Sequence, residues 1–246
     1  YTKDHDVVWS GDFVVSPQQG MNLDSFEIVD YSLSTTGITN LYTAGRGTLM
    51  SESGISSGLE QDAGTTLYGN AVIVNGVLEL DGVGDYAEVH DNFRYTDMIT
   101  VSVWFQSTGI GDQRIYSSHV RQAGNNGFFA RLDAGTLRMR APDGGVGELV
   151  LTSGLNDGEW HHLVMSWEAS TTNGRNIYLD GSLINTANGG TANGYNPSFG
   201  LLVGANPWSG NLPYAHLNGK IVGFKVLNEA MTALEVETEY NTTAPT

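Results

Sequence analysis

The sequence predicts an all-β fold: a two-sheet antiparallel β-sandwich with a short C-terminal helix. Three observations lead to this prediction. From about residue 65 onward, short alternating runs recur at regular spacing. Glycine is abundant, with 32 of 246 residues, which favours many turns between short strands. Asn75-Gly76 separates two apolar runs, the strongest short-range signal for a β-hairpin.

Period-2 alternation places the individual strands. In residues 99–106, for example, Val101, Val103 and Phe105 share one face, and Trp104 points to the other. The expected strands are 70–80 with a turn at Asn75-Gly76, 86–89, 99–106, 114–120, 127–132, 136–140, 148–152, 161–168, 176–179, 199–203 and 220–227.

The end of the chain has a helical pattern. Residues 228–240 are the expected helix, with Thr232 as N-cap and Glu235 completing a capping box three residues later. Residues 1–64 are harder to interpret, although 7–9, 13–15 and 26–31 are candidate strands. We therefore predict one domain over 1–246, with 65–240 as its core and 1–64 as an extension or as extra strands.

The composition excludes some partners. With 27 acidic and 11 basic residues, the formal net charge is −16, and such a surface repels nucleic acids and anionic membranes. No apolar run approaches the roughly 20 residues that cross a membrane. There are no cysteines, which fits a secreted bacterial protein without excluding a cytosolic one. We expect a secreted protein whose leader segment has been removed, although acidity for solubility alone explains the charge equally well.

One segment is more informative than the rest. Residues 155–167 (LNDGEWHHLVMSW) form a turn leading into an aromatic strand, and residues 177–181 (IYLDG) form a second strand ending in an Asp-Gly turn. Together they resemble the laminin-G-like, concanavalin-A-like jelly-roll family over about 65–240. The resemblance implies a sandwich that carries lectin modules, adhesion modules or polysaccharide-cleaving enzymes. It also implies that one of His161 and His162 packs inside with Trp160 and Trp167, while the other is at the surface.

Arginines are concentrated in residues 114–140. Alternation places Arg138 and Arg140 on one face of their strand, and Arg131 lies on a strand nearby in sequence. If these strands are neighbours, the guanidinium groups converge and suit carboxylate or sulfate groups of an anionic polysaccharide. The alternative is that each arginine pairs with one of the many carboxylates.

A further group of residues is a candidate for catalysis. Tyr116, His119 and Arg121 include the acid, base and carboxylate-holding groups of a polysaccharide lyase, although alternation points Tyr116 and His119 to opposite faces. No Gly-x-Ser-x-Gly motif and no transition-metal spacing is present.

Acidic turns and an aromatic loop complete the candidates. Asp81, Asp85 and Asp180 are candidate ligands of a structural Ca²⁺, since members of the resembled fold often hold one in such turns; ordinary turn aspartates are the alternative. Residues 204–216 form a Gly- and Pro-rich loop, and its rings suit stacking on sugars unless they fold down onto the sandwich. The loop's candidate ligand-binding residues are Trp208, Tyr214 and His216.

These observations favour an extracellular, non-catalytic carbohydrate-binding module for an anionic polysaccharide, within a larger secreted protein. A polysaccharide lyase that cleaves a uronic-acid glycan by β-elimination is the second hypothesis. A structural adhesion module with a protein partner is the third.

Overall fold

The computed structural model describes residues 8–9, 13–14, 65–89, 97–118, 127–142, 148–191, 201–207 and 213–245. The chain divides into two compact units, 1–38 and 39–246. In the first unit, β1 (Val8–Trp9) pairs with β2 (Phe13–Val14) in an antiparallel ladder. The prediction that all 246 residues form one domain is not tested by these residues and stays a prediction.

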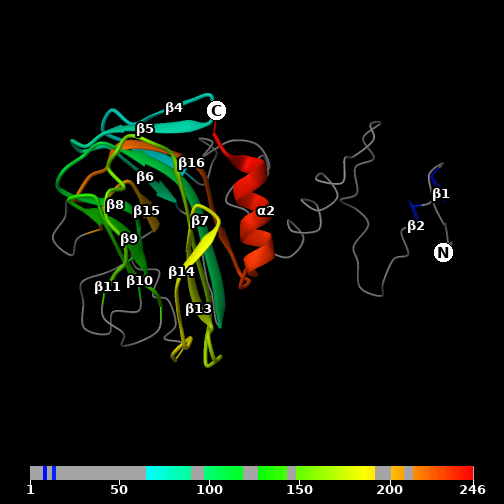
Figure 1. The fold of residues 1–246 in the computed structure, drawn as a ribbon. Coiled ribbons are helices and arrows are strands. Elements are labelled where there is room, and N and C mark those ends of the chain that lie inside the picture. Colours follow the sequence, from blue (N-terminus) through cyan, green and yellow to red (C-terminus); the bar gives the residue numbers. More distant parts are fainter. Residues whose placement is uncertain are drawn as a thin grey trace, which may run out of the picture. The chain divides into compact units, whose positions relative to one another are not determined.

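The second unit is the predicted β-sandwich, built from two antiparallel sheets of seven strands each (Figure 1). The first sheet has the order β11-β10-β9-β8-β15-β6-β3, and the second has the order β14-β13-β12-β7-β16-β5-β4. The strands are β3 (Thr65–Tyr68), β4 (Val72–Val74), β5 (Val77–Asp81), β6 (Tyr86–Val89), β7 (Met98–Ser107), β8 (Asp112–Ser117), β9 (Phe129–Asp133), β10 (Thr136–Arg140), β11 (Leu149–Val150), β12 (His161–Glu168), β13 (Arg175–Leu179), β14 (Ser182–Ala187), β15 (Leu201–Val203) and β16 (Asn218–Leu227).

The core between the sheets follows the predicted alternation. Val101, Val103 and Phe105 of β7 are fully buried in it, together with Leu163 and Trp167 of β12. The predicted hairpin forms, since β4 pairs with β5 across Asn75-Gly76. The two strands of the informative segment, β12 and β13, also pair antiparallel. The sequence reading missed β3 and β14, because neither short run alternates clearly between apolar and polar residues. No helix in the described part of the chain is both long and apolar enough to cross a membrane.

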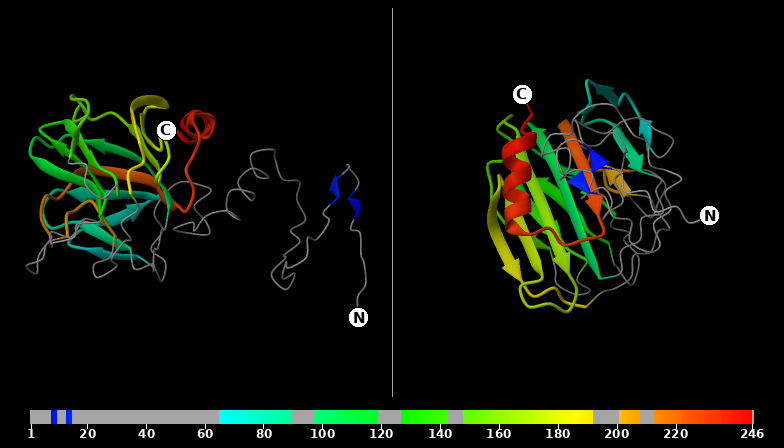
Figure 2. Two further views of the ribbon diagram at one scale, coloured as in Figure 1. Left: turned by 90° about the horizontal axis from the view of Figure 1, so that it is seen from below. Right: turned by 90° about the vertical axis from the view of Figure 1, so that its right-hand side faces the viewer.

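The C-terminal helix α2 (Ala233–Thr243) begins later than predicted, and its N-cap is the predicted one. The Thr232 side chain accepts a hydrogen bond from the Glu235 backbone N–H, and the Glu235 carboxylate accepts one from the Thr232 backbone N–H. The helix lies across the outer face of the second sheet (Figure 2, right). A small second core joins it there, formed by Val164, Tyr178, Leu227, Met231 and Val236.

A buried carboxylate fixes α2 to the second sheet. Glu239 is 9 % exposed, and its Oε1 accepts a hydrogen bond from Ser102 Oγ at 2.6 Å. The same oxygen lies 3.3 Å from His162 Nε2, and Oε2 lies 2.7 Å from Lys225 Nζ. Burial alone would raise the pKa of Glu239, but the His162 hydrogen bond and the Lys225 charge outweigh it and lower the pKa to about 2.

One prediction about the histidine pair is wrong. His162 is the buried one, but it points away from the core that holds Trp167. It stacks on Trp104 with ring centroids 4.8 Å apart, under α2. The reason is strand parity: His162 shares the outer face of β12 with Val164 and Ser166, and the helix covers that face. His161 contacts Asp180 and Asp157 instead.

Replacing Glu239 with Ala should lower the free energy of unfolding by about 3 kcal/mol, because the buried Ser102 and His162 lose their acceptor. Glu237→Ala is the matched control: Glu237 is exposed on the same helix, so its loss should change stability by less than about 0.5 kcal/mol. Urea denaturation measures both. Equal effects of the two substitutions would contradict the role of Glu239.

The same carboxylate should make stability depend on pH. Since folding lowers the pKa of Glu239 from 4.5 to about 2, its contribution is complete above pH 4.5 and is lost as the pH falls toward 2. Glu239→Gln cannot titrate, so its unfolding free energy should decline less steeply across this window than that of the wild type. Parallel declines in a series of denaturation curves would show that Glu239 is not responsible.

Candidate functional site

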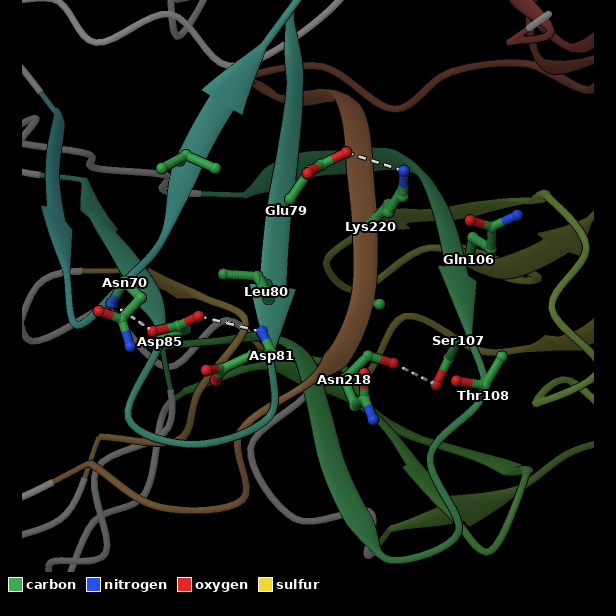
Figure 3. A pocket seen from close by; sticks show the side chains of 12 residues that line it. Asn70, Glu79, Leu80, Asp81, Asp85, Gln106, Ser107, Thr108, Asn218 and Lys220 are labelled. Carbon is green, nitrogen blue, oxygen red and sulfur yellow. Dashed lines mark hydrogen bonds and ion pairs between the residues drawn. The ribbon is translucent and has the colours of Figure 1, made fainter.

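An open groove of about 470 Å³ lies on the outer face of the second sheet, over strands β4, β5, β7 and β16 (Figure 3). It runs onto the end of the sandwich where β5 and β7 finish and β16 begins. Most of the residues that line it have polar side chains, among them Asn70, Glu79, Asp81, Gln106, Asn218 and Lys220.

Strand register aligns one row of outward-facing residues across the groove. Val72 lies opposite Glu79, Glu79 opposite Lys220, and Lys220 opposite Gln106. Lys220 Nζ lies 2.8 Å from Glu79 Oε1, and both side chains are more than 40 % exposed. Gln106 Nε2 donates to the Gly158 carbonyl at 2.6 Å. The row therefore combines an ammonium group, a carboxylate, an amide and an aliphatic surface.

Asn218 is held rigidly at the end of this groove. Its backbone N–H donates to Gln113 Oε1 at 2.8 Å, and its carbonyl accepts from Ser107 Oγ at 3.2 Å. Its own side chain is exposed toward the groove (Figure 3). The next residue must be glycine, because a Cβ on residue 219 would clash with the Gln106 carbonyl oxygen. Gly219 therefore allows the backbones of β16 and β7 to approach closely.

A buried aspartate shapes the other wall. Asp85 is 1 % exposed, and its two carboxylate oxygens accept hydrogen bonds from the backbone N–H groups of Asn70 at 2.5 Å and Asp81 at 3.0 Å. Asp81 Oδ1 in turn accepts from the Val83 N–H at 2.7 Å. Asp85 is thus a structural acceptor that orders the turn, whereas Asp81 remains exposed at the groove.

The predicted arginines lie on the other sheet. Their strands are neighbours: Arg131 lies directly opposite Arg138 on one side and Arg114 on the other. However, Arg131 forms ion pairs with Glu148 and Asp112, and Arg138 lies 3.1 Å from Asp133. Hydrogen bonding to Glu148 is the largest influence that raises the pKa of Arg131. Much of the positive charge is therefore balanced within the protein.

Arg114 differs from the other members of this row. It is only 7 % exposed, and its guanidinium lies 4.3 Å from the centre of the Phe129 ring. Among the described residues, its buried Nε and Nη1 find no hydrogen-bond partner. Burial is the main cause that lowers the pKa of Arg114. The sequence reading did not select it, because alternation alone gives no sign that an arginine is buried.

Of the other predicted ligand-binding residues, Tyr214 lies near the arginine row, since the carbonyl of the adjacent Ala215 accepts a hydrogen bond from the Arg114 backbone N–H at 2.8 Å. Tyr214 forms an isolated antiparallel bridge with Asn206. His216 contacts the carbonyl oxygens of Asp85 and Pro213, each at 3.2 Å. Trp208 lies outside the described residues. Arg140 is half-buried on β10, opposite Phe129. Their roles in binding stay predictions.

The lyase residues do not form an accessible site in the described part of the chain. Tyr116 is fully buried in the core, and burial raises its pKa far above the ordinary value. The ladder of β8 with β9 has a bulge between Arg114 and Tyr116, so strict alternation does not hold along this strand. His119 and Arg121 lie outside the described residues.

Of the candidate calcium ligands, Asp81 and Asp85 lie in the same turn, and Asp180 follows β13. Asp85 is committed to the turn described above. Asp180 accepts from the His162 backbone N–H at 2.9 Å and contacts His161 Nδ1 at 3.0 Å. Among the residues that the structure describes, no three histidine or acidic side chains gather to hold a metal ion. The calcium site stays a prediction.

Sequence reasoning missed the groove. Gln106 and Lys220 were already placed on predicted strands, and the parity of 99–106 put Gln106 on the outer face. The sequence does not predict that α2 leaves this part of the outer face open. Asn218 had no signal, because the strand that begins with it was predicted to start at Lys220.

Comparison with known proteins agrees with this architecture. Residues 81–237 match the family model of the concanavalin A-like lectin/glucanases superfamily. The chain belongs to this superfamily. No curated protein sequence matches it.

Solved structures share the fold of this lectin/glucanase-superfamily chain. The binding domain of paraclostridial mosquitocidal protein 1 is 15 % identical, with TM-score 0.58 over 80 % of this chain and 52 % of that one. Botulinum neurotoxin type C, whose cell entry depends on two ganglioside molecules, is 12 % identical, with TM-score 0.58 over 84 % and 53 %. The binding domain of botulinum neurotoxin DC in complex with SialylT is 13 % identical, with TM-score 0.53 over 72 % and 46 %. At these identities the likeness establishes the fold alone, and the chain spans about half the length of these proteins.

Replacing Asp85 with Ala should lower the free energy of unfolding by about 2 kcal/mol, because two backbone N–H groups lose their acceptor. Asp81→Ala is the control: Asp81 is exposed and holds a single N–H, so the loss should stay below about 1 kcal/mol. Thermal unfolding followed by circular dichroism measures both. A larger loss in Asp81→Ala would contradict this assignment.

Proposed function

We propose that the chain is a carbohydrate-binding module of a larger secreted protein, and that a glycan binds in the groove of the second sheet. The observation that carries this proposal is the groove itself: an open cavity, lined mostly by residues with polar side chains, on a lectin/glucanase-superfamily sandwich. The structural neighbours that interact with gangliosides or were solved with SialylT support a carbohydrate ligand. The secreted location rests on the composition of the sequence.

The lining groups match the chemistry of sugar hydroxyls. A hydroxyl both donates and accepts hydrogen bonds, so it is recognised by carboxylates, which accept, ammonium groups, which donate, and amides, which do both. The groove has all three kinds of group: the carboxylates of Glu79 and Asp81, the ammonium group of Lys220, and the amides of Asn70 and Asn218. Val72, which is 46 % exposed, offers an aliphatic surface to the apolar face of a sugar ring.

The charge of the groove favours a neutral glycan. Glu79, Asp81 and Asp85 contribute three carboxylates, and Lys220 is the single cation among the lining residues. Because Lys220 is already paired with Glu79, a uronate or sulfate group in the groove would face uncompensated negative charge. The ligand proposed for this groove is therefore a hydroxyl-rich, uncharged oligosaccharide.

An anionic polysaccharide on the arginine row of the first sheet is the second candidate. It is favoured by Arg114, whose buried Nε and Nη1 have no hydrogen-bond partner among the described residues and suit a carboxylate or sulfate oxygen. Against it stand the ion pairs of Arg131 and Arg138 with their own carboxylates. The lyase alternative gains no support from Tyr116, whose hydroxyl is buried away from solvent.

A glycan array that contains neutral and anionic polysaccharides, followed by isothermal titration calorimetry, separates these candidates. Asn218→Ala should weaken binding of the selected glycan about tenfold, because one hydrogen-bonding group of the groove is lost while the backbone bonds of residue 218 remain. The matched control is the double variant Arg138→Ala, Arg140→Ala on the opposite sheet, which should bind as the wild type does. Loss of binding in the double arginine variant, with unchanged binding in Asn218→Ala, would place the site at the arginine row instead. Binding of no glycan on the array would contradict the proposed function.

A further inference from the structure

Two apolar side chains project from the loops at the end of the sandwich where the groove opens. Val83 is 76 % exposed and Ile110 is 83 % exposed. Each stands between two glycines, in Gly82-Val83-Gly84 and Gly109-Ile110-Gly111. A large aliphatic group held this far out in water has no function in the core.

Topology places the two loops on the same end of the second sheet. β5 and β7 both pair antiparallel with β16, so they run parallel to each other and finish together: Asp81 lies opposite Asn218, and Ser107 lies opposite Gly219. Both loops then border Asn218. A Cβ on Gly82 would lie 2.9 Å from the Asn218 Cβ, and the Thr108 N–H donates to the Asn218 carbonyl at 3.4 Å.

Hydrogen bonds brace both tips. The Val83 N–H donates to Asp81 Oδ1, and Asp81 is in turn held by Asp85. In the second loop, the Gly109 N–H donates to Ser107 Oγ at 3.2 Å, and its carbonyl accepts from Asn156 Nδ2 at 3.2 Å. The tips are therefore held projecting outward, and they do not fold back over the polar groove.

We infer that this end of the module binds glycolipid at a membrane surface: the sugar occupies the groove, and Val83 and Ile110 enter the interfacial region of the bilayer. This inference rests on the proposed function of the groove. A glycolipid in a bilayer presents a hydroxyl-rich sugar next to apolar lipid. The groove suits the sugar, and the two aliphatic tips suit the lipid. Two isolated aliphatic tips, separated by Asn218, suit shallow insertion between lipids better than one continuous protein patch.

Charge selects the kind of membrane. The exposed Asp81 lies beside the Val83 tip, and the chain carries a formal net charge of −16. Anionic lipids would repel this end of the molecule. The partner is therefore a neutral glycolipid in a zwitterionic bilayer.

Binding to phosphatidylcholine vesicles with and without a neutral glycosylceramide tests the inference, with the matching free oligosaccharide measured in parallel. Val83→Ser and Ile110→Ser should each weaken binding to glycolipid vesicles about tenfold or more and leave binding of the free oligosaccharide unchanged. Val150→Ser and Leu234→Ser are the controls, because these aliphatic residues are 61 % and 71 % exposed elsewhere on the surface. They should bind vesicles as the wild type does.

The outcomes separate the two claims. If the free oligosaccharide binds but the tip variants bind glycolipid vesicles as tightly as the controls do, the inferred membrane contact is wrong and the proposed function of the groove stands. If vesicles without glycolipid bind equally well, the joint recognition of sugar and lipid is wrong. If neither the free oligosaccharide nor the glycolipid vesicles bind, the proposed function fails together with this inference.

Discussion

The buried carboxylate of Glu239 determines how the second sheet meets solvent. An outward-facing sheet surface that carries Trp104, Val164 and Tyr178 must be covered, since leaving these side chains in water would forfeit much of their burial free energy. The capped helix α2 provides the cover, and Glu239 anchors it through Ser102, His162 and Lys225. A buried charge is tolerated there because each of its oxygens has a cationic or hydrogen-bonding partner.

The groove is what this covering leaves open. Beyond Trp104, β7 continues to Gln106, and the neighbouring strands present Lys220, Glu79 and Val72 in register. These residues are polar or only partly exposed aliphatics, so they need no cover. The strand ends then bring rigid loops to the same place. The geometry that supports ligand binding thus follows from the limited length of α2 and from the parallel course of β5 and β7 on either side of β16.

Much of this fold was predictable from sequence. Alternation identified the core faces of β7 and β12, Asn75-Gly76 identified a hairpin, and Thr232 with Glu235 identified the helix cap. These features are local, so they leave a signal within a few residues. The environment of His162 was not predictable, because it depends on a helix more than 70 residues away in sequence.

The candidate sites show the same distinction. Parity correctly grouped the arginines of neighbouring strands, but the partners of Arg131, Asp112 and Glu148, come from segments whose approach only the folded sheet reveals. The bulge that separates Arg114 from Tyr116 interrupts an alternation that looks regular in the sequence. The groove joins residues from four strands and required the strand order before it could be recognised.

The most direct test of the account is a nuclear magnetic resonance titration of the isotopically labelled protein with a neutral oligosaccharide selected on the array. The account predicts that the side-chain amide resonances of Gln106 and Asn218 shift in a saturable way while the Arg138 guanidinium resonances stay in place. Shifts confined to the arginine row, with both amides unchanged, would contradict it.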